Sequence, residues 1–132
     1  MSGRPKVMIV DDEVGVRESL RAILMADYDV LTADTGAAAI ELLRQHDVDV
    51  VTLDLRMPGM GGIGVLEQAK GINPDVEAII ITGYGSLDTA IQGLRYHAFD
   101  YISKPFDCDQ VREQSGLDAA NLVAHVQHAR ID

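Results

Sequence analysis

Short apolar runs alternate along this chain with longer segments in which apolar residues recur every three or four positions. The runs predict buried strands, since a parallel strand covered on both faces is apolar throughout. The longer segments predict helices, each with one apolar face turned toward a sheet. The five predicted strands cover residues 7–10, 28–33, 48–53, 76–82 and 99–103.

A helix is predicted after every strand. The apolar stripes that predict the first four helices are Val16, Leu20, Ile23 and Leu24; Ala39, Ile40, Leu42 and Leu43; Ile63, Val65, Leu66 and Ala69; and Ala90, Ile91 and Leu94. Thr35 is expected to cap the second helix, and residues 57–62, rich in Gly and Pro, are expected to form a loop. The final helix, from residue 107 to about 130, either breaks at Gly116 or continues with a weak point there, and a continuous helix is favoured.

Strands that alternate with helices predict an α/β fold with a parallel, doubly wound sheet covered on both faces. The chain has 132 residues, the size of one ordinary domain, and no linker or repeat precedes residue 107. We therefore expect a single domain over residues 1–132, with its core at about 6–115 and residues 116–132 completing the last helix, which can lead into an output domain absent from this chain.

The composition of the chain limits its possible binding partners and the cellular compartment in which we expect it. A formal net charge of −10 argues against direct nucleic-acid contact by this domain, because phosphate binding needs clustered Lys and Arg. Cys108 is the only cysteine, so an internal disulfide is ruled out and a reducing compartment is expected. The sequence shows no signal peptide, and no apolar stretch approaches the roughly 20 residues of a membrane span, so a cytoplasmic protein without membrane contact is predicted.

Four polar signals follow the predicted strands. They are the pair Asp11 and Asp12, then Asp54, Thr82 and Lys104. The carboxyl ends of parallel strands open into one crevice, where ligands bind. Each signal alone has a bland interpretation, such as a helix N-cap, a turn residue or a loop lysine, but together they predict one site.

Clustered carboxylates of this kind are stable only when a cation or bound protons offset their repulsion. An oxygen-rich site of two or three carboxylates suits Mg²⁺, which prefers to share a substrate phosphate. Lys104 adds a mobile positive charge and Thr82 a hydroxyl donor. These parts predict phosphoryl transfer to a carboxylate, with Asp54 as the nucleophile.

The chain resembles the receiver domains of two-component response regulators. The matching stretches are VMIVDDE at 7–13, VVTLDLRMPGMGG at 50–62, IITG at 80–83 and YISKPF at 101–106. The resemblance implies a flavodoxin-like fold with five helices and strand order 2-1-3-4-5. It also implies a signalling switch rather than an enzyme, one that catalyses only its own Mg²⁺-dependent phosphorylation and dephosphorylation.

The same resemblance implies a role for each matching residue. Asp54 is the phosphoacceptor, Asp12 binds Mg²⁺ directly, Asp11 helps through water, and the Arg56 carbonyl is a further metal ligand. Lys104, followed by a cis bond to Pro105, pairs with the phosphoryl group. Thr82 moves toward that group while the ring of Tyr101 turns inward, which reshapes the face made by the fourth helix, fifth strand and fifth helix.

The implied partners are a sensor histidine kinase or phosphotransfer protein and an output, most readily transcription regulation through an ATPase activator domain. The reshaped face also suits a homodimer. The rival function is an aspartyl-phosphate phosphatase, but that class needs an acid at position 56, which is Arg. A third alternative is a degenerate receiver that only binds proteins, against which the intact polar residues argue.

Three further motifs are set aside. The glycines of residues 59–64 match a dinucleotide fingerprint but do not follow the first strand. His125 and His128 share a helix face, yet no further metal ligand lies near them in the sequence. Cys108 is interpreted as structural or incidental.

Overall fold

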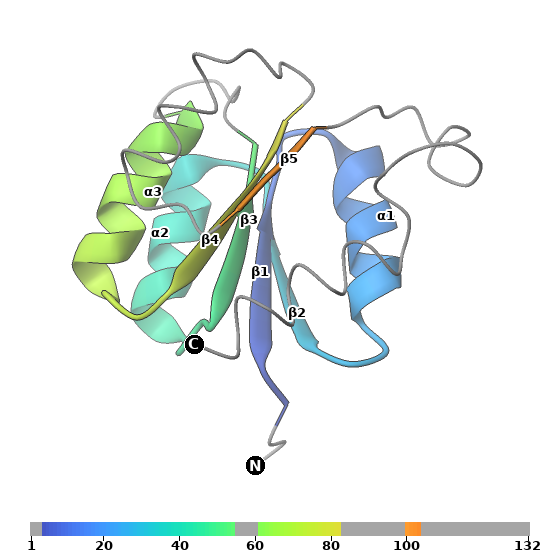
Figure 1. The fold of residues 1–132 in the computed structure, drawn as a ribbon, viewed down its shortest axis with the longest axis horizontal. Helices are drawn as coiled ribbons and strands as arrows, with labels where there is room; N and C mark the ends of the chain where they lie inside the picture. The colour runs from blue at the N-terminus through green and yellow to red at the C-terminus, as the bar shows by residue number, and fades with distance from the viewer. Residues whose placement is uncertain (1–3, 55–60, 83–99, 104–132) are drawn as a thin grey trace.

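The computed structural model describes residues 4–54, 61–82 and 100–103 of the chain (Figure 1). For Thr82 and residues 100–103 it describes the backbone. In chain order the elements are β1 (Lys6–Val10), α1 (Val14–Leu24), β2 (Asp29–Ala33), α2 (Gly36–Gln45), β3 (Val50–Leu53), α3 (Gly61–Ile72), β4 (Glu77–Thr82) and β5 (Asp100–Ser103).

The strands form one sheet in the order β2-β1-β3-β4-β5, and every neighbouring pair is parallel. Parallel neighbours need crossover connections, and the helices supply them in the described part of the chain. The α/β fold with a parallel sheet, predicted from the sequence, is confirmed. The predicted fourth and fifth helices lie in residues 83–99 and 104–132, outside the described residues.

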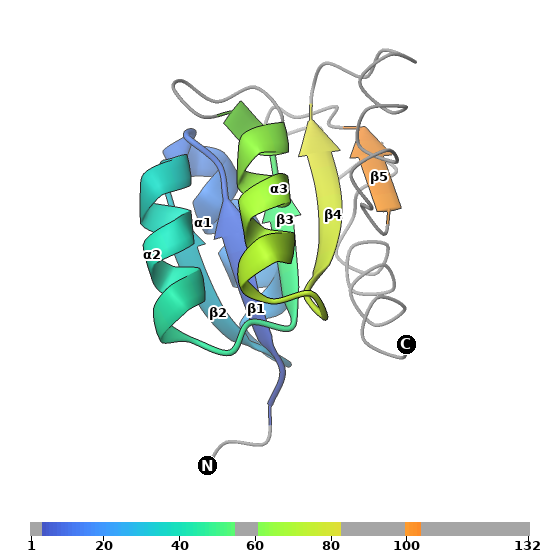
Figure 2. The same ribbon diagram turned by 90° about the vertical axis from the view of Figure 1, so that its left-hand side faces the viewer.

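The helices cover both faces of the sheet: α1 lies on one face, and α2 and α3 lie together on the other (Figure 2). Each face is buried against its helices by side chains that alternate along the strands. On the α1 face the strand members of the core are Val7, Ile9, Val50, Ile79 and Ile81. On the opposite face they are Met8, Val10, Ala33, Val51, Leu53, Ala78 and Ile80.

The predicted apolar stripes are confirmed for α1 and α2, and for α3 at Val65, Leu66 and Ala69. Ile63 of the predicted α3 stripe is only partly buried. Val16, Leu20 and Leu24 of α1 are buried, and Ile23 packs beside them. The predicted cap of α2 is also confirmed, since the Thr35 side chain accepts a hydrogen bond of 3.1 Å from the backbone N–H of Ala38. A hydroxyl at this position satisfies one of the free N–H groups of the first helical turn.

The loop predicted over residues 57–62 is wrong at its end, because α3 begins at Gly61. Gly61 has a φ of 74°, a backbone conformation that other residues rarely adopt, and Gly62 is buried. Both glycines therefore belong to the entry of the helix. Three strands also begin one or two residues later than predicted: β2 at Asp29, β3 at Val50 and β4 at Glu77.

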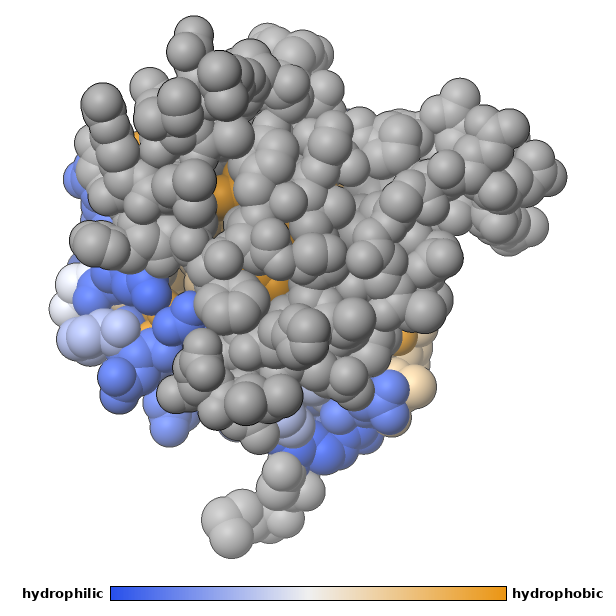
Figure 3. Space-filling model, viewed as in Figure 1, coloured by the Kyte–Doolittle hydropathy of each residue, from blue (hydrophilic) through white to orange (hydrophobic). Residues whose placement is uncertain are grey.

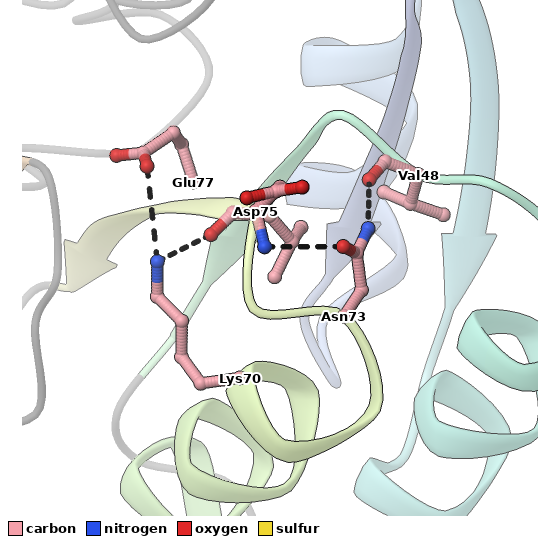
Figure 4. Close-up of polar contacts among 6 residues, drawn as sticks. Val48, Lys70, Asn73, Asp75 and Glu77 are labelled. Carbon is pink, nitrogen blue, oxygen red and sulfur yellow. Dashed lines mark hydrogen bonds and ion pairs between the residues drawn. The ribbon is translucent and has the colours of Figure 1, made fainter. Parts of the chain in front are cut away.

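A polar network ties α3 to the start of β4 at the amino-terminal edge of the sheet (Figure 4). The Lys70 ammonium donates a hydrogen bond to the carbonyl oxygen of Val76 and lies 3.8 Å from a carboxylate oxygen of Glu77. The Asn73 side chain donates to the carbonyl oxygen of Val48, at 3.1 Å. These contacts pair the carbonyl oxygens of the residues that lead into β3 and β4, Val48 and Val76.

The described surface in Figure 3 is mainly hydrophilic where α3 lies, as expected for the solvent side of an amphipathic helix. Glu67 and Gln68 are among the exposed residues of that helix. Within the described ranges, no helix has the length and apolar character needed to cross a bilayer.

Thr52 is the exception to the apolar interior of β3. It is 1% exposed, and its hydroxyl has no hydrogen-bond partner among the residues that the structure describes. A buried hydroxyl without a partner destabilises the folded state, because it loses its bonds to water. Thr52→Val keeps the shape of the side chain and is expected to raise the free energy of unfolding by about 1 kcal/mol.

Urea denaturation would measure this change, with Thr32→Val as the matched control. Thr32 is an exposed strand residue, so the same replacement is expected to change stability by less than about 0.5 kcal/mol. A Thr52→Val protein less stable than the parent would contradict the prediction.

Candidate functional site

The register of the sheet places Asp11 and Asp54 beside each other. Val10 of β1 pairs with Leu53 of β3, and each aspartate directly follows the last residue of its strand. The backbone keeps both positions fixed: the N–H of Asp54 donates to the carbonyl oxygen of Val10, and that of Asp11 donates to Ala33, each at 3.1 Å. The two side chains therefore begin at the carboxyl edge of the sheet, on neighbouring strands.

A tight turn connects β1 to α1 and carries three acidic residues. One carboxylate oxygen of Asp11 accepts a hydrogen bond from the N–H of Glu13, at 2.9 Å. The N-cap of α1 is Glu13, whose side chain makes no capping hydrogen bond. The interpretation of the Asp pair as a helix N-cap is therefore wrong. Asp11 holds the turn through its own carboxylate, as aspartate often does.

Arg17 adds a second link to this turn. Its guanidinium donates a hydrogen bond of 2.9 Å to the carbonyl oxygen of Asp11, from the second turn of α1. The contact is partly buried, so a positive side chain lies next to the acidic turn. It connects the start of α1 to the end of β1.

Four carboxylates converge at this point: Asp11, Asp12, Glu13 and Asp54 each offer an oxygen, and these oxygens all lie within 4.8 Å of one another. Asp11 and Asp54 are 2% and 5% exposed, whereas Asp12 and Glu13 are exposed to solvent. The predicted proximity of the Asp pair to Asp54 is confirmed. Glu13 was not predicted as a member of this cluster, because the sequence does not indicate the direction in which the side chain after the Asp pair points.

The chemistry of this donor set suits a hard divalent cation. Two unit negative charges at this spacing repel by roughly 3 kcal/mol at an effective dielectric constant of about 20. Carboxylate oxygens are the ligands that Mg²⁺ and Ca²⁺ prefer, and a cation would turn the repulsion into attraction. The start of α1 contributes further positive potential from its free N–H groups.

The other predicted site residues are described in part or not at all. Thr82 is the last residue of β4 and pairs in register with Ser103 of β5, so both backbones end at the same edge as Asp54. Tyr101 lies on β5 in register with Ile80. Arg56 and Lys104, with the predicted cis bond to Pro105, lie outside the described residues.

Comparisons with known proteins agree on one family. The sequence model of one protein family, the response regulator receiver domain, matches residues 7–115 of the chain. The chain is 36% identical to the transcriptional regulatory protein ZraR of Escherichia coli O157:H7 over 121 residues, which cover 91% of this chain and 27% of that protein. It is 35% identical to sporulation initiation phosphotransferase F of Bacillus subtilis over 109 residues, or 82% of this chain and 88% of that protein.

Solved structures give the same result. One similar structure is the CheX-CheY-BeF3-Mg+2 complex of Borrelia burgdorferi, with a TM-score of 0.80 and 27% sequence identity. The match covers 94% of this chain and 87% of that one. The chain thus spans nearly the whole of the small relatives but only about a quarter of the transcriptional regulator.

Proposed function

This chain belongs to the response regulator receiver domain family, and from that premise we propose that Asp54 is its phosphoacceptor. The observation that supports the proposal most strongly is the convergence of the carboxylates of Asp11, Asp12 and Asp54 at one sheet edge. Receiver domains are the signalling switches of two-component systems. Catalysis by this domain is limited, in our proposal, to its own phosphorylation and dephosphorylation.

We propose Mg²⁺ as the cofactor, held by the carboxylates of Asp11, Asp12 and Asp54 and by the backbone carbonyl of Arg56. The donor set is entirely oxygen, as Mg²⁺ requires, and the similar CheX-CheY complex of Borrelia burgdorferi includes this ion. When bound, the ion would neutralise negative charge on the transferring phosphoryl group.

The residues of the chain would then act as follows. A carboxylate oxygen of Asp54 attacks phosphorus, the bond from phosphorus to the donor breaks, and its electron pair leaves with the donor group. In the proposal Lys104 pairs with the phosphoryl oxygens, Thr82 donates its hydroxyl to them, and Tyr101 changes its ring position. The new dianion would thereby bias the face of the fourth helix, β5 and the fifth helix.

The finer features of the predicted system remain proposals. The donor would be a sensor histidine kinase or a phosphotransfer protein, and the output would be transcription regulation by a domain that lies outside this chain. The similarity to ZraR and to phosphotransferase F supports these two roles. The proposed domain extends over residues 1–132 with five helices, and a homodimer through the switch face and a cytoplasmic location also stay predictions.

Incubation of the chain with acetyl phosphate tests the function directly. With Mg²⁺, intact-mass spectrometry is expected to show the gain of one phosphoryl group, in an acyl phosphate that hydroxylamine removes. With EDTA in place of Mg²⁺ the gain is expected to disappear, because the charge on the phosphoryl group is no longer neutralised. Repeated turnover of diverse phosphoesters would instead support a phosphatase, and a lack of any mass gain would support a protein-binding module.

A further inference from the structure

Glu13 lies at a helix N-cap position, but its side chain does not cap the helix. It is the N-cap of α1, with extended backbone angles, φ −95° and ψ 119°. Helix N-caps favour Asp, Asn, Ser and Thr, whose short side chains reach the free N–H groups. Glu is not among them, and the Glu13 side chain makes no capping hydrogen bond. Its carboxylate instead lies within 4.8 Å of those of Asp11, Asp12 and Asp54.

We propose that Glu13 is an outer ligand of the divalent cation, which it contacts through a metal-bound water. This inference rests on the proposed metal site, and it adds a residue that the predicted set of Asp11, Asp12, Asp54 and the Arg56 carbonyl does not contain. Glu13 would raise the affinity of the site and would not take part in the attack on phosphorus.

Burial distinguishes the roles of the four carboxylates. Asp11 and Asp54 are almost fully buried and their backbones are fixed by the sheet, so they form the floor of the site. Glu13 is exposed on the rim, with a longer and more flexible side chain. Because Mg²⁺ dehydrates reluctantly and keeps several waters, a rim carboxylate would accept a hydrogen bond from one of them.

The alternative role for Glu13 is that of a solvated surface carboxylate near the site by chance. Two hydrogen bonds fix the backbone of Glu13. Its N–H donates to a carboxylate oxygen of Asp11, and its carbonyl oxygen accepts from the N–H of Arg17. The turn therefore fixes where the side chain starts. In the metal-free protein this placement has a cost, because it brings one more negative charge to a cluster that is already repulsive.

Glu13→Gln tests the proposal, with Glu18→Gln as the matched control. Both are exposed glutamates at or in α1, and both replacements remove one negative charge, but Glu18 pairs with Arg21 instead of the acidic cluster. In calorimetric titrations with MgCl₂, Glu13→Gln is expected to weaken binding about threefold, the effect of a screened unit charge acting through one water. Glu18→Gln is expected to change binding by less than about 1.5-fold, since its charge is more distant and screened.

The stability of the metal-free proteins gives a second readout that structural damage would not produce. In EDTA, Glu13→Gln is expected to unfold at a higher urea concentration than the parent, because it relieves repulsion. Glu13→Asp keeps the charge and is expected to retain most of the affinity. A Glu13→Gln protein with parental affinity, or one that is less stable in EDTA, would overturn the inference. If the parent itself fails to bind Mg²⁺, the proposed metal site is wrong, and this outcome is separate from a failure of Glu13 alone.

Discussion

Asp54→Asn is expected to abolish covalent phosphorylation of the chain by acetyl phosphate, with a loss of at least about 100-fold in the rate. An amide nitrogen or oxygen is a far poorer nucleophile than a carboxylate, so the phosphorus–oxygen bond would not form. The replacement is nearly the same size, so the fold should survive. Intact-mass spectrometry over a time course in Mg²⁺ measures the result.

Asp34→Asn is the matched control for this replacement. Asp34 follows β2 as Asp54 follows β3, so both aspartates come directly after a parallel strand. Asp34 is exposed and does not belong to the cluster of four carboxylates. The Asp34→Asn protein should be phosphorylated at the parental rate. Phosphorylation of Asp54→Asn at a comparable rate, on whichever residue, would show that Asp54 is not the acceptor.

The second large effect concerns stability. Leu24→Ala is expected to lower the free energy of unfolding by about 2–5 kcal/mol, since Leu24 is the last residue of α1 and is fully buried. It packs with the α1 face of the sheet, and its removal would leave a cavity there. A loss of this size is a large part of the total stability of an ordinary domain, which is about 5–15 kcal/mol.

Met25→Ala provides the comparison at the next position. Met25 is 50% exposed, so its truncation is expected to cost less than about 0.5 kcal/mol. Urea denaturation of both variants in EDTA separates the effect of burial from that of metal binding. Equal losses for the two variants would mean that Leu24 is not part of the core in solution.

The parts of the fold that the sequence predicted follow from simple periodicity. The stripe of Val16, Leu20 and Leu24 identified the buried face of α1, because a helix returns to the same face every three or four residues. Asp11 and Asp54 were expected to meet because parallel strands end at a common edge. The structure places both as expected.

The remaining features depend on information that periodicity does not contain. Gly61 was assigned to a loop because glycine is common in turns. In the structure it instead provides the positive φ at the start of α3, and the sequence alone does not distinguish these two uses of glycine. Thr52 fits a strand as well as valine does, so its unpartnered hydroxyl was not foreseen. Glu13 lies in the acidic cluster because of the turn that Asp11 closes, which is a tertiary effect of one side chain.

The residue pairing between β1 and β3 also limits where the gene can tolerate inserted or deleted codons. Successive residues of a strand point to opposite faces, so one codon inserted within β3 would turn Asp54 away from Asp11 and toward the face of α2 and α3. One codon inserted between α2 and β3 would leave the pairing intact, since connections tolerate such changes. Natural length variation among homologous genes is therefore expected in the connections and is expected to be absent from the four codons of β3.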